Sequence, residues 1–315
     1  MNFKVARSWG AFALTAAIAL AALWALPAAA QQAGYIGEKA CIGCHGQENL
    51  HFTETLHAKL FRQNPRNERE RQVCESCHGP GSLHAKNTKD RSLLVSFTKG
   101  WGTPVETQNQ ACLSCHQGGN RLHWPGSTHA GNQLGCADCH NPMQEVSGKG
   151  LLTKASISEV CQGCHQQQRA EFNKRSHMPL AEGKMSCVDC HNPHGSPTKP
   201  LLKADSVNVL CTSCHAEKRG PMLWEHAPVR ESCTNCHAPH GSNHDKLLVA
   251  ARPQLCQQCH SPSVGHPGQF YNASQTAANA QLGGTASQRV IGRSCQNCHS
   301  QIHGSNHPAG ARLQR

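Results

Sequence analysis

Residues 161–195 read CQGCHQQQRAEFNKRSHMPLAEGKMSCVDCHNPHG, and residues 211–241 read CTSCHAEKRGPMLWEHAPVRESCTNCHAPHG. Each stretch contains two Cys-x-x-Cys-His motifs, a histidine between them, and a Pro-His-Gly sequence soon after the second motif. The whole chain of 315 residues contains ten such motifs, which use all 20 of its cysteines. The repeating unit is therefore a pair of motifs, and the ten motifs form five pairs.

The ten motifs predict covalent attachment of ten c-type haems. Two sulfurs one helical turn apart meet the vinyl groups on one haem edge, and the adjacent imidazole binds the iron from the same side. We expect thioether bonds at Cys41, Cys44, Cys74, Cys77, Cys112, Cys115, Cys136, Cys139, Cys161, Cys164, Cys187, Cys190, Cys211, Cys214, Cys233, Cys236, Cys256, Cys259, Cys295 and Cys298. We expect the proximal iron ligands to be His45, His78, His116, His140, His165, His191, His215, His237, His260 and His299.

Two other uses of paired cysteines explain the pattern less well. Exported proteins rich in cysteine are often disulfide scaffolds, and zinc ribbons also contain Cys-x-x-Cys pairs. Neither requires a histidine directly after every pair, whereas haem attachment does.

The composition predicts an unusual interior. Phe, Trp and Tyr number only 7, 5 and 2, which is too few to fill a conventional core. We therefore predict that packed haems replace the core, in a multihaem cytochrome c fold that forms an elongated rod. The polypeptide should be mostly coil, with short α-helices at and after the motifs, for example at residues 166–173, and almost no β structure. Residues 268–292 should form a loop.

The N-terminus predicts export. Lys4 and Arg7 precede an apolar run at residues 9–26, and small residues at 28–30 resemble a cleavage site, so we interpret residues 1–30 as a signal peptide. A retained anchor is the alternative, although the run is short for a bilayer span. We divide the remainder into two pentahaem halves, residues 31–165 and 166–315.

The basic charge is balanced by the expected cofactor. The formal net charge is +11, or +9 without Lys4 and Arg7. Ten haems would add twenty propionate charges and, when ferric, ten positive charges, leaving about −1. The basic residues are therefore interpreted as propionate partners, and no nucleic-acid partner is expected. We interpret the arginine-rich segment 62–71 as a solvated linker.

Thirteen of the 23 histidines lie outside the motifs. Five lie between the motifs of a pair and four follow a second motif, positions that suit distal iron ligands. Bis-imidazole iron is suited to electron transfer because it leaves no open coordination site. The expected distal ligands are His57, His84, His129, His177, His194, His226, His240, His266 and His303, while His51, His123, His244 and His307 are weaker candidates.

One position breaks the repeat. In the third and fourth pairs, the third residue after the second proximal histidine is again histidine, but in the second pair it is Met143. Methionine is also a haem ligand and raises the reduction potential relative to imidazole. We predict that Met143 is a distal ligand of one haem early in the chain. The alternative is that Met143 only packs against a haem while His123 fills the site.

Three stretches extend the pattern beyond the motifs. These are CTSCHAEKRGP with WEHAP (211–221 and 224–228), PQLCQQCH (253–260), and the segment from GRSC to HGSNHP (292–308). Through them the chain resembles the MtrA/MtoA/DmsE family of periplasmic decahaem cytochromes over nearly its whole length after residue 30.

This resemblance implies a location and partners. It implies a rod of ten haems in the periplasm, held inside an outer-membrane β-barrel porin, with a periplasmic cytochrome as electron carrier and an outer-surface multihaem cytochrome as a further candidate partner. By the same analogy, the haem at His45 lies towards the periplasm and the haem at His299 towards the cell exterior.

Three functions are compatible with the motifs. The first is an electron conduit between periplasmic carriers and extracellular iron or another acceptor or donor, which needs no catalytic residue. The second is a soluble periplasmic electron shuttle. The third is a multihaem oxyanion reductase, which needs an open iron site and nearby acid–base groups, whereas this chain has surplus histidines and only Tyr35 and Tyr271 as phenols.

We expect the purified holoprotein to begin at Gln31 and to carry ten haems, because each motif is complete. Intact-protein mass spectrometry should give the mass of residues 31–315 plus ten haem masses. A stable species with eight haems or fewer would contradict this count.

Overall fold

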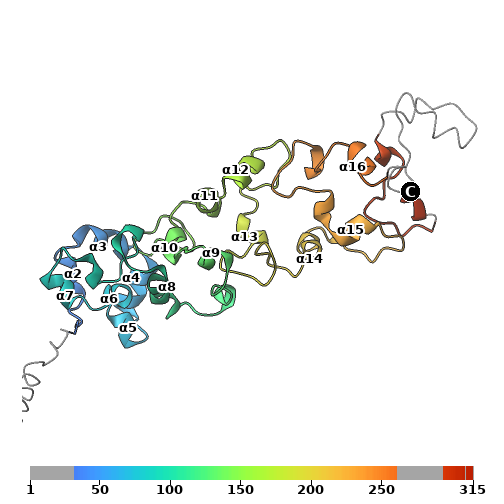
Figure 1. Ribbon diagram of the computed structural model, residues 1–315. Coiled ribbons are helices and arrows are strands. Elements are labelled where there is room, and N and C mark those ends of the chain that lie inside the picture. Colours follow the sequence, from blue (N-terminus) through green and yellow to red (C-terminus); the bar gives the residue numbers. More distant parts are fainter. Residues whose placement is uncertain (1–31, 261–293, 309, 315) are drawn as a thin grey trace, which may run out of the picture.

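A computed structural model describes residues 32–260, 294–308 and 310–314. Figure 1 shows an elongated body with the first helices at one end and the segment after residue 294 at the other. The described residues contain short helices and isolated β-bridges but no strand. The prediction of a rod with little β structure is therefore confirmed, while the predictions for residues 1–30 and 268–292 lie outside the described residues.

Of the helices of the first two pairs, those up to α8 gather at one end of the rod, and α9 and α10 lie towards its middle (Figure 1). The helices of these two pairs are α2 (Glu38–Ile42), α3 (Gly46–Thr53), α4 (Leu56–Gln63), α5 (Glu68–Arg71), α6 (Glu75–His78), α7 (Ser82–Lys86), η1 (Arg91–Leu93), η2 (Lys99–Trp101), α8 (Val105–Leu113), η3 (Gly119–Arg121), α9 (Thr128–Gly131) and α10 (Cys136–Cys139).

The remaining helices are distributed along the rest of the rod. They are α11 (Ile157–Gln162), α12 (Gln166–Phe172), α13 (Cys187–Cys190), α14 (Val207–Thr212), η4 (Ala216–Lys218), α15 (Ala227–Glu231), η5 (Cys233–Asn235), η6 (Asp245–Leu247), α16 (Gln254–Gln257), η8 (Cys295–Asn297) and η9 (Gly310–Arg312). The helix predicted at 166–173 is α12.

The two motifs of a pair have different local structures. The first motif of each pair has its first cysteine in or at the last turn of a helix, as Cys161 in α11 and Cys211 in α14. The second motif instead begins a short helical turn. In α13 the Asp189 carboxylate accepts a hydrogen bond from the backbone N–H of Ser186 at 2.6 Å, which caps that turn.

The loop after a second motif also repeats. The backbone N–H groups of Asn141, Asn192 and Ala238 donate to the carbonyls of Leu151, Leu201 and Leu247 at 2.6, 2.8 and 2.7 Å. The three leucines share a left-handed backbone conformation, with φ between 47° and 60°. Pairs two, three and four are therefore structurally equivalent, which permits position-by-position comparison.

The apolar core is very small. Its one cluster of buried residues consists, within the described part of the chain, of Phe52, Ala58 and Val73, with Phe61, Cys74 and Met143 packed against it. Burying so few side chains cannot offset the conformational entropy of ordering some 250 residues, at about 1 kcal/mol or more for each backbone. The fold requires another source of buried apolar surface.

The prediction of a solvated linker at residues 62–71 is wrong. Arg62 belongs to α4 and donates through Nε to the Glu38 carboxylate at 2.8 Å. Glu70 is only 2% exposed and accepts hydrogen bonds from the backbone N–H and the guanidinium of Arg66 at 2.6 and 2.7 Å. Opposite charges interleaved along the sequence are paired here in space, so the segment is structured.

The described helices do not include a membrane span. None of them has both the length and the apolar character that a bilayer crossing requires.

We expect the apoprotein to be unfolded, because the buried apolar cluster is too small to support the rod without haem. Far-ultraviolet circular dichroism of haem-free chain should show a disordered spectrum, and the holoprotein should show helical signal. A cooperative thermal transition in the apoprotein would contradict this expectation.

Candidate haem-binding sites

Seven of the ten proximal histidines lie opposite a second histidine ring. The distances between ring centroids are narrowly distributed, from 5.8 to 6.4 Å. The pairs are His45 with His84 (6.4 Å), His116 with His57 (5.8 Å), His140 with His194 (6.0 Å), His165 with His129 (6.2 Å), His191 with His240 (6.1 Å), His237 with His303 (6.2 Å) and His260 with His226 (6.1 Å).

This separation fits two axial ligands of one iron. Two metal–nitrogen bonds of about 2 Å, plus about 1 Å from each nitrogen to its ring centre, place the centroids of axial imidazoles about 6 Å apart. Direct packing of two rings would allow shorter contacts. The protein therefore holds these histidines at the spacing that a haem iron would require.

The hydrogen bonds of the rings leave one nitrogen available. The proximal histidine of each second motif has Nδ1 within 2.6–2.9 Å of a backbone carbonyl. Since a carbonyl can only accept, Nδ1 must carry the proton and Nε2 must carry the lone pair that binds metal. The acceptors for His78, His140, His191, His237 and His299 are the carbonyls of Val95, Gly150, Pro200, Lys246 and Arg312.

Burial favours the metal-binding form of several rings. Desolvation lowers the pKa of His57, His78, His116, His194, His240 and His303, so these imidazoles are neutral at neutral pH. Neutral imidazole is the form that binds metal. In addition, Nδ1 of His57, His84 and His194 is buried without a hydrogen-bond partner. Burying an unpaired polar atom costs free energy unless the ring binds some other group.

One described histidine among the nine expected distal ligands, His177, does not face a proximal histidine. The Nε2 of His177 lies 3.2 Å from the Glu182 carboxylate, and Nδ1 lies 2.7 Å from the Lys174 carbonyl. The hydrogen bond to the Lys174 carbonyl, and then that to Glu182, raise the pKa of His177. His266 lies outside the described residues.

The paired rings follow a regular rule. The histidine between the two motifs of one pair faces the first proximal histidine of the next pair, as His129 faces His165. The histidine after a second motif faces the second proximal histidine of the preceding pair, as His194 faces His140. Neighbouring pairs therefore exchange rings in both directions. His84, in the first pair, instead faces His45 of its own pair.

The cysteines form a continuous series along the rod. Within a pair the thiols of the two first cysteines are neighbours that affect each other's electrostatics. Between pairs, burial raises the pKa of the earlier second cysteine, and the second cysteine of the next motif raises it further. The neighbouring thiols are Cys41–Cys74, Cys77–Cys115, Cys112–Cys136, Cys139–Cys164, Cys161–Cys187, Cys190–Cys214, Cys211–Cys233, Cys236–Cys259 and Cys256–Cys295. All twenty cysteines are free of disulfides, so each thiol is available for a thioether bond.

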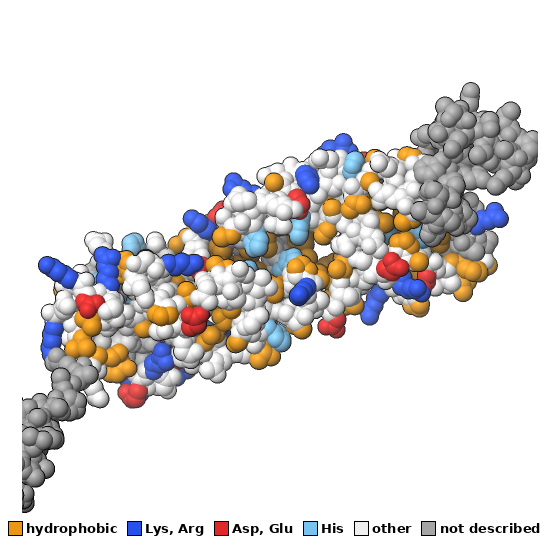
Figure 2. All heavy atoms as spheres, viewed as in Figure 1, with side chains coloured by type: hydrophobic (Ala, Val, Ile, Leu, Met, Phe, Trp, Pro, Cys, Tyr) orange, Lys and Arg blue, Asp and Glu red, His pale blue; other side chains and the backbone are white. Residues whose placement is uncertain are grey.

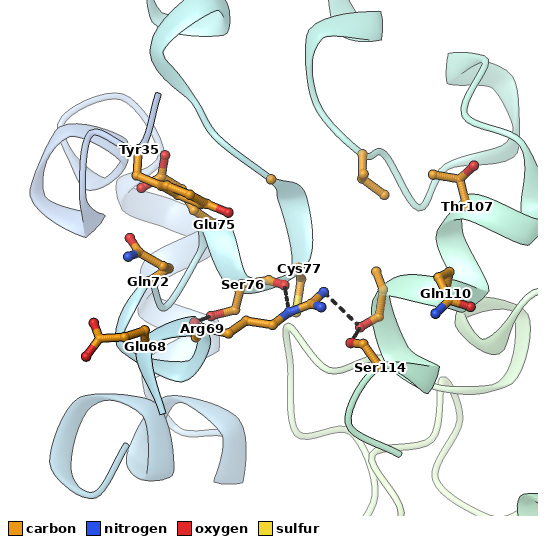
Figure 3. Close-up of a pocket in the computed structure, with 13 residues that line it drawn as sticks. Tyr35, Glu68, Arg69, Gln72, Glu75, Ser76, Cys77, Thr107, Gln110 and Ser114 are labelled. Atoms are coloured by element: carbon orange, nitrogen blue, oxygen red, sulfur yellow. Dashed lines mark hydrogen bonds between the residues drawn. The ribbon is translucent and has the colours of Figure 1, made fainter. Parts of the chain in front are cut away.

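A pocket of about 480 Å³ adjoins Cys77 between α6 and α8 (Figure 3). Arg69 crosses it, donating to the carbonyl of Ser76 at 3.1 Å and to that of Ala111 at 3.5 Å. Burial raises the pKa of the Cys77 thiol, and the Arg69 guanidinium partly opposes this shift.

The surface shows where the histidines gather. Figure 2 shows histidine and apolar side chains together in the hollowed middle of one face of the rod, with Lys and Arg side chains distributed along its margins.

Comparison with known proteins supports the same cofactor. Residues 129–170, 177–220 and 226–265 match the doubled CXXCH motif family, and residues 74–149 match the NrfB-like cytochrome c-type protein family. Over 283 residues the chain is 44% identical to multiheme cytochrome MtrA of Shewanella baltica, covering 89% of this chain and 81% of that protein. The chain belongs to the MtrA family of multihaem c-type cytochromes.

A second relative is more distant. Cytochrome c-type protein NrfB of Haemophilus influenzae is 34% identical over 135 residues, which cover 40% of this chain and 58% of that protein. As a member of the MtrA family, this cytochrome carries covalently attached c-type haems and is an electron-transfer protein rather than an enzyme. Each doubled-motif match begins at or close to an expected distal histidine, namely His129, His177 or His226.

We expect His240→Ala to leave one haem without its sixth ligand, because His240 is the ring opposite His191. Electron paramagnetic resonance should then show high-spin ferric iron at about one haem in ten. The matched control is His244→Ala, four residues away, which should leave the low-spin spectrum unchanged. Equal spectra for the two variants would contradict the ring assignment.

Proposed function

We propose that this cytochrome conducts electrons across the outer membrane, inside a β-barrel porin, between a periplasmic carrier and extracellular iron or another acceptor or donor. Electrons would pass by hopping from haem to haem. The sequence is compatible with either direction of flow, since a chain of haems conducts according to the potentials at its two ends.

The observation that carries this proposal is the unbroken series of neighbouring thiols. A thioether bond fixes a haem edge to its cysteine, so neighbouring cysteines of consecutive motifs place consecutive haem edges near each other. Thiols interact electrostatically at all nine steps from Cys41 to Cys295. Because these motifs lie at opposite ends of the rod (Figure 1), the attachment sites run along its length.

The axial rings suit the same role. We assign the second ring of each of the seven pairs as the distal ligand of the facing haem. Low-spin iron with two imidazoles has no open position for substrate, so the chemistry the haem supplies is the gain and loss of one electron. The protein supplies spacing, orientation of the rings and shielding from water.

Seven assignments leave three proximal histidines that face no second histidine among the described residues: His78, whose ring lies 5.4 Å from that of Phe97, and His215 and His299. The rule of ring exchange assigns His177 to His215, in place of its hydrogen bond to Glu182. We keep His266 as a distal ligand without assigning it to a haem.

The partners follow from the shape and from the family. A polar rod can cross a bilayer only when another structure separates it from the lipid, and a closed β-barrel does this. We place the end containing His45 in the periplasm, beside a cytochrome carrier, and the end containing His299 at the cell exterior, beside an outer-surface cytochrome where one is present.

A soluble periplasmic shuttle is the second candidate, favoured by the local match of residues 74–149 to NrfB-like proteins. The two functions require the same haems and differ in the barrel. The location of the cytochrome in the cell distinguishes the conduit from the shuttle.

We expect deletion of the barrel gene to release this cytochrome from the outer-membrane fraction into the periplasm, or to lower its amount. Haem-stained gels of fractionated cells would measure this, with a periplasmic monohaem cytochrome as the control for leakage. Outer-membrane association that persists without any barrel would overturn the conduit proposal, and a periplasmic location in the parent strain would favour the shuttle.

A further inference from the structure

The rule of ring exchange has one position where the facing residue is not histidine. The third residue after a second-motif proximal histidine faces the second proximal histidine of the preceding pair, as His194 faces His140 at 6.0 Å and His240 faces His191 at 6.1 Å. The third residue after His140 is Met143. The preceding pair is the first, and its second proximal histidine is His78.

The backbone presents Met143 as it presents His194. The N–H of Met143 donates to Oδ1 of Asn141 at 3.1 Å, and the N–H of His194 donates to Oδ1 of Asn192 at 3.2 Å. Both side chains therefore leave the same kind of Asn-Pro turn, and the methionine has not altered the local fold.

In pairs two and three an aromatic ring marks this ligand position, whereas the equivalent residue of pair four is Pro221. Trp124 lies 6.4 Å from the ring of His194, and Phe172 lies 5.5 Å from the ring of His240. Each of these aromatic residues stands five positions before the histidine that lies between the motifs of its pair. The aromatic residue and the facing ligand thus form one recurring contact.

The first pair has the same contact, in which Met143 takes the place of the histidine. Phe52 is the residue five positions before the between-motif histidine. Met143 packs against the buried cluster of Phe52, Ala58 and Val73, and Cys74 of the second motif packs against that cluster too. Met143 and an attachment cysteine of the second haem therefore pack against the same small cluster, as the rule of ring exchange requires.

We propose that Met143 is the sixth ligand of the iron at the second motif, opposite His78, so that this one haem has imidazole–thioether ligation. The thioether sulfur binds iron without losing a proton, and it favours ferrous iron more than imidazole does. The reduction potential of the second haem is then higher than that of the bis-imidazole haems. This inference rests on haem attachment at Cys74 and Cys77 and not on the porin.

One surplus histidine, His123, is placed at another site. His51 and His123 both stand six positions before a between-motif histidine, and both are exposed. The backbone of His123 packs closely against Gly195, the residue after His194. His123 therefore lies beside the facing rings of His140 and His194, which would hold the fourth haem.

The test is near-infrared magnetic circular dichroism of the oxidised holoprotein, which separates imidazole–thioether from bis-imidazole ferric haem. The parent should show one imidazole–thioether haem in ten. Met143→His should remove that band and give ten bis-imidazole haems, and Met143→Leu should remove it and give one high-spin haem. Met222→Leu is the matched control for loss of a partly buried methionine and should leave the band intact.

Three outcomes would overturn the proposal: ten bis-imidazole haems in the parent, a band that persists in Met143→Leu, or loss of low-spin iron in His123→Ala. Redox titration gives a second measure, in which Met143→His should lower the potential of one haem of the ten. An electron cryomicroscopy structure of the holoprotein should then show the Met143 sulfur bonded to the iron at His78, and bonding to any other haem would also count against it. Loss of outer-membrane association alone would affect only the conduit.

Discussion

The close approach of two imidazole rings from neighbouring motif pairs is the contact on which the rest of the structure depends. Each pair of motifs is too short and too poor in apolar residues to form a core of its own. When one pair extends a histidine over the attachment site of the next, and receives one in return, the two become a single unit. Repeating this exchange produces a rod, because each pair can exchange rings only with its two neighbours.

This construction explains why so little secondary structure is needed. The helices are short, and the described residues are joined mainly by turns and isolated bridges. Their function is to fix the backbone at the motifs, through caps such as Asp189, and to direct carbonyls at proximal imidazoles. A carbonyl that holds Nδ1 orients the ring as firmly as packing would, and it leaves Nε2 available for iron.

The first pair is a partial exception and shows how the repeat adapts. It is the only place in the described chain with a buried hydrophobic cluster, and the ion pairs of α4 and α5 support that cluster from outside. Its first haem site takes a ring from within the pair, since His84 faces His45. An end of a rod has no earlier neighbour, so the first site must obtain its second ring locally.

The sequence by itself determined the cofactor, the number of motifs, the pairing of motifs and the lack of a conventional core, because each of these follows from local spacing or from composition. Its nine expected distal ligands include all seven histidines that face a proximal ring in the described chain. Only the tertiary structure decided which ring faces which motif. His129 and the Pro193 carbonyl that orients it are 64 residues apart, and no local pattern encodes such a contact. The arginine-rich segment shows the same limit, since alternating charges are compatible both with a solvated linker and with buried ion pairs. The choice between them depends on whether another segment, here the one containing Glu38, folds back to pair with them.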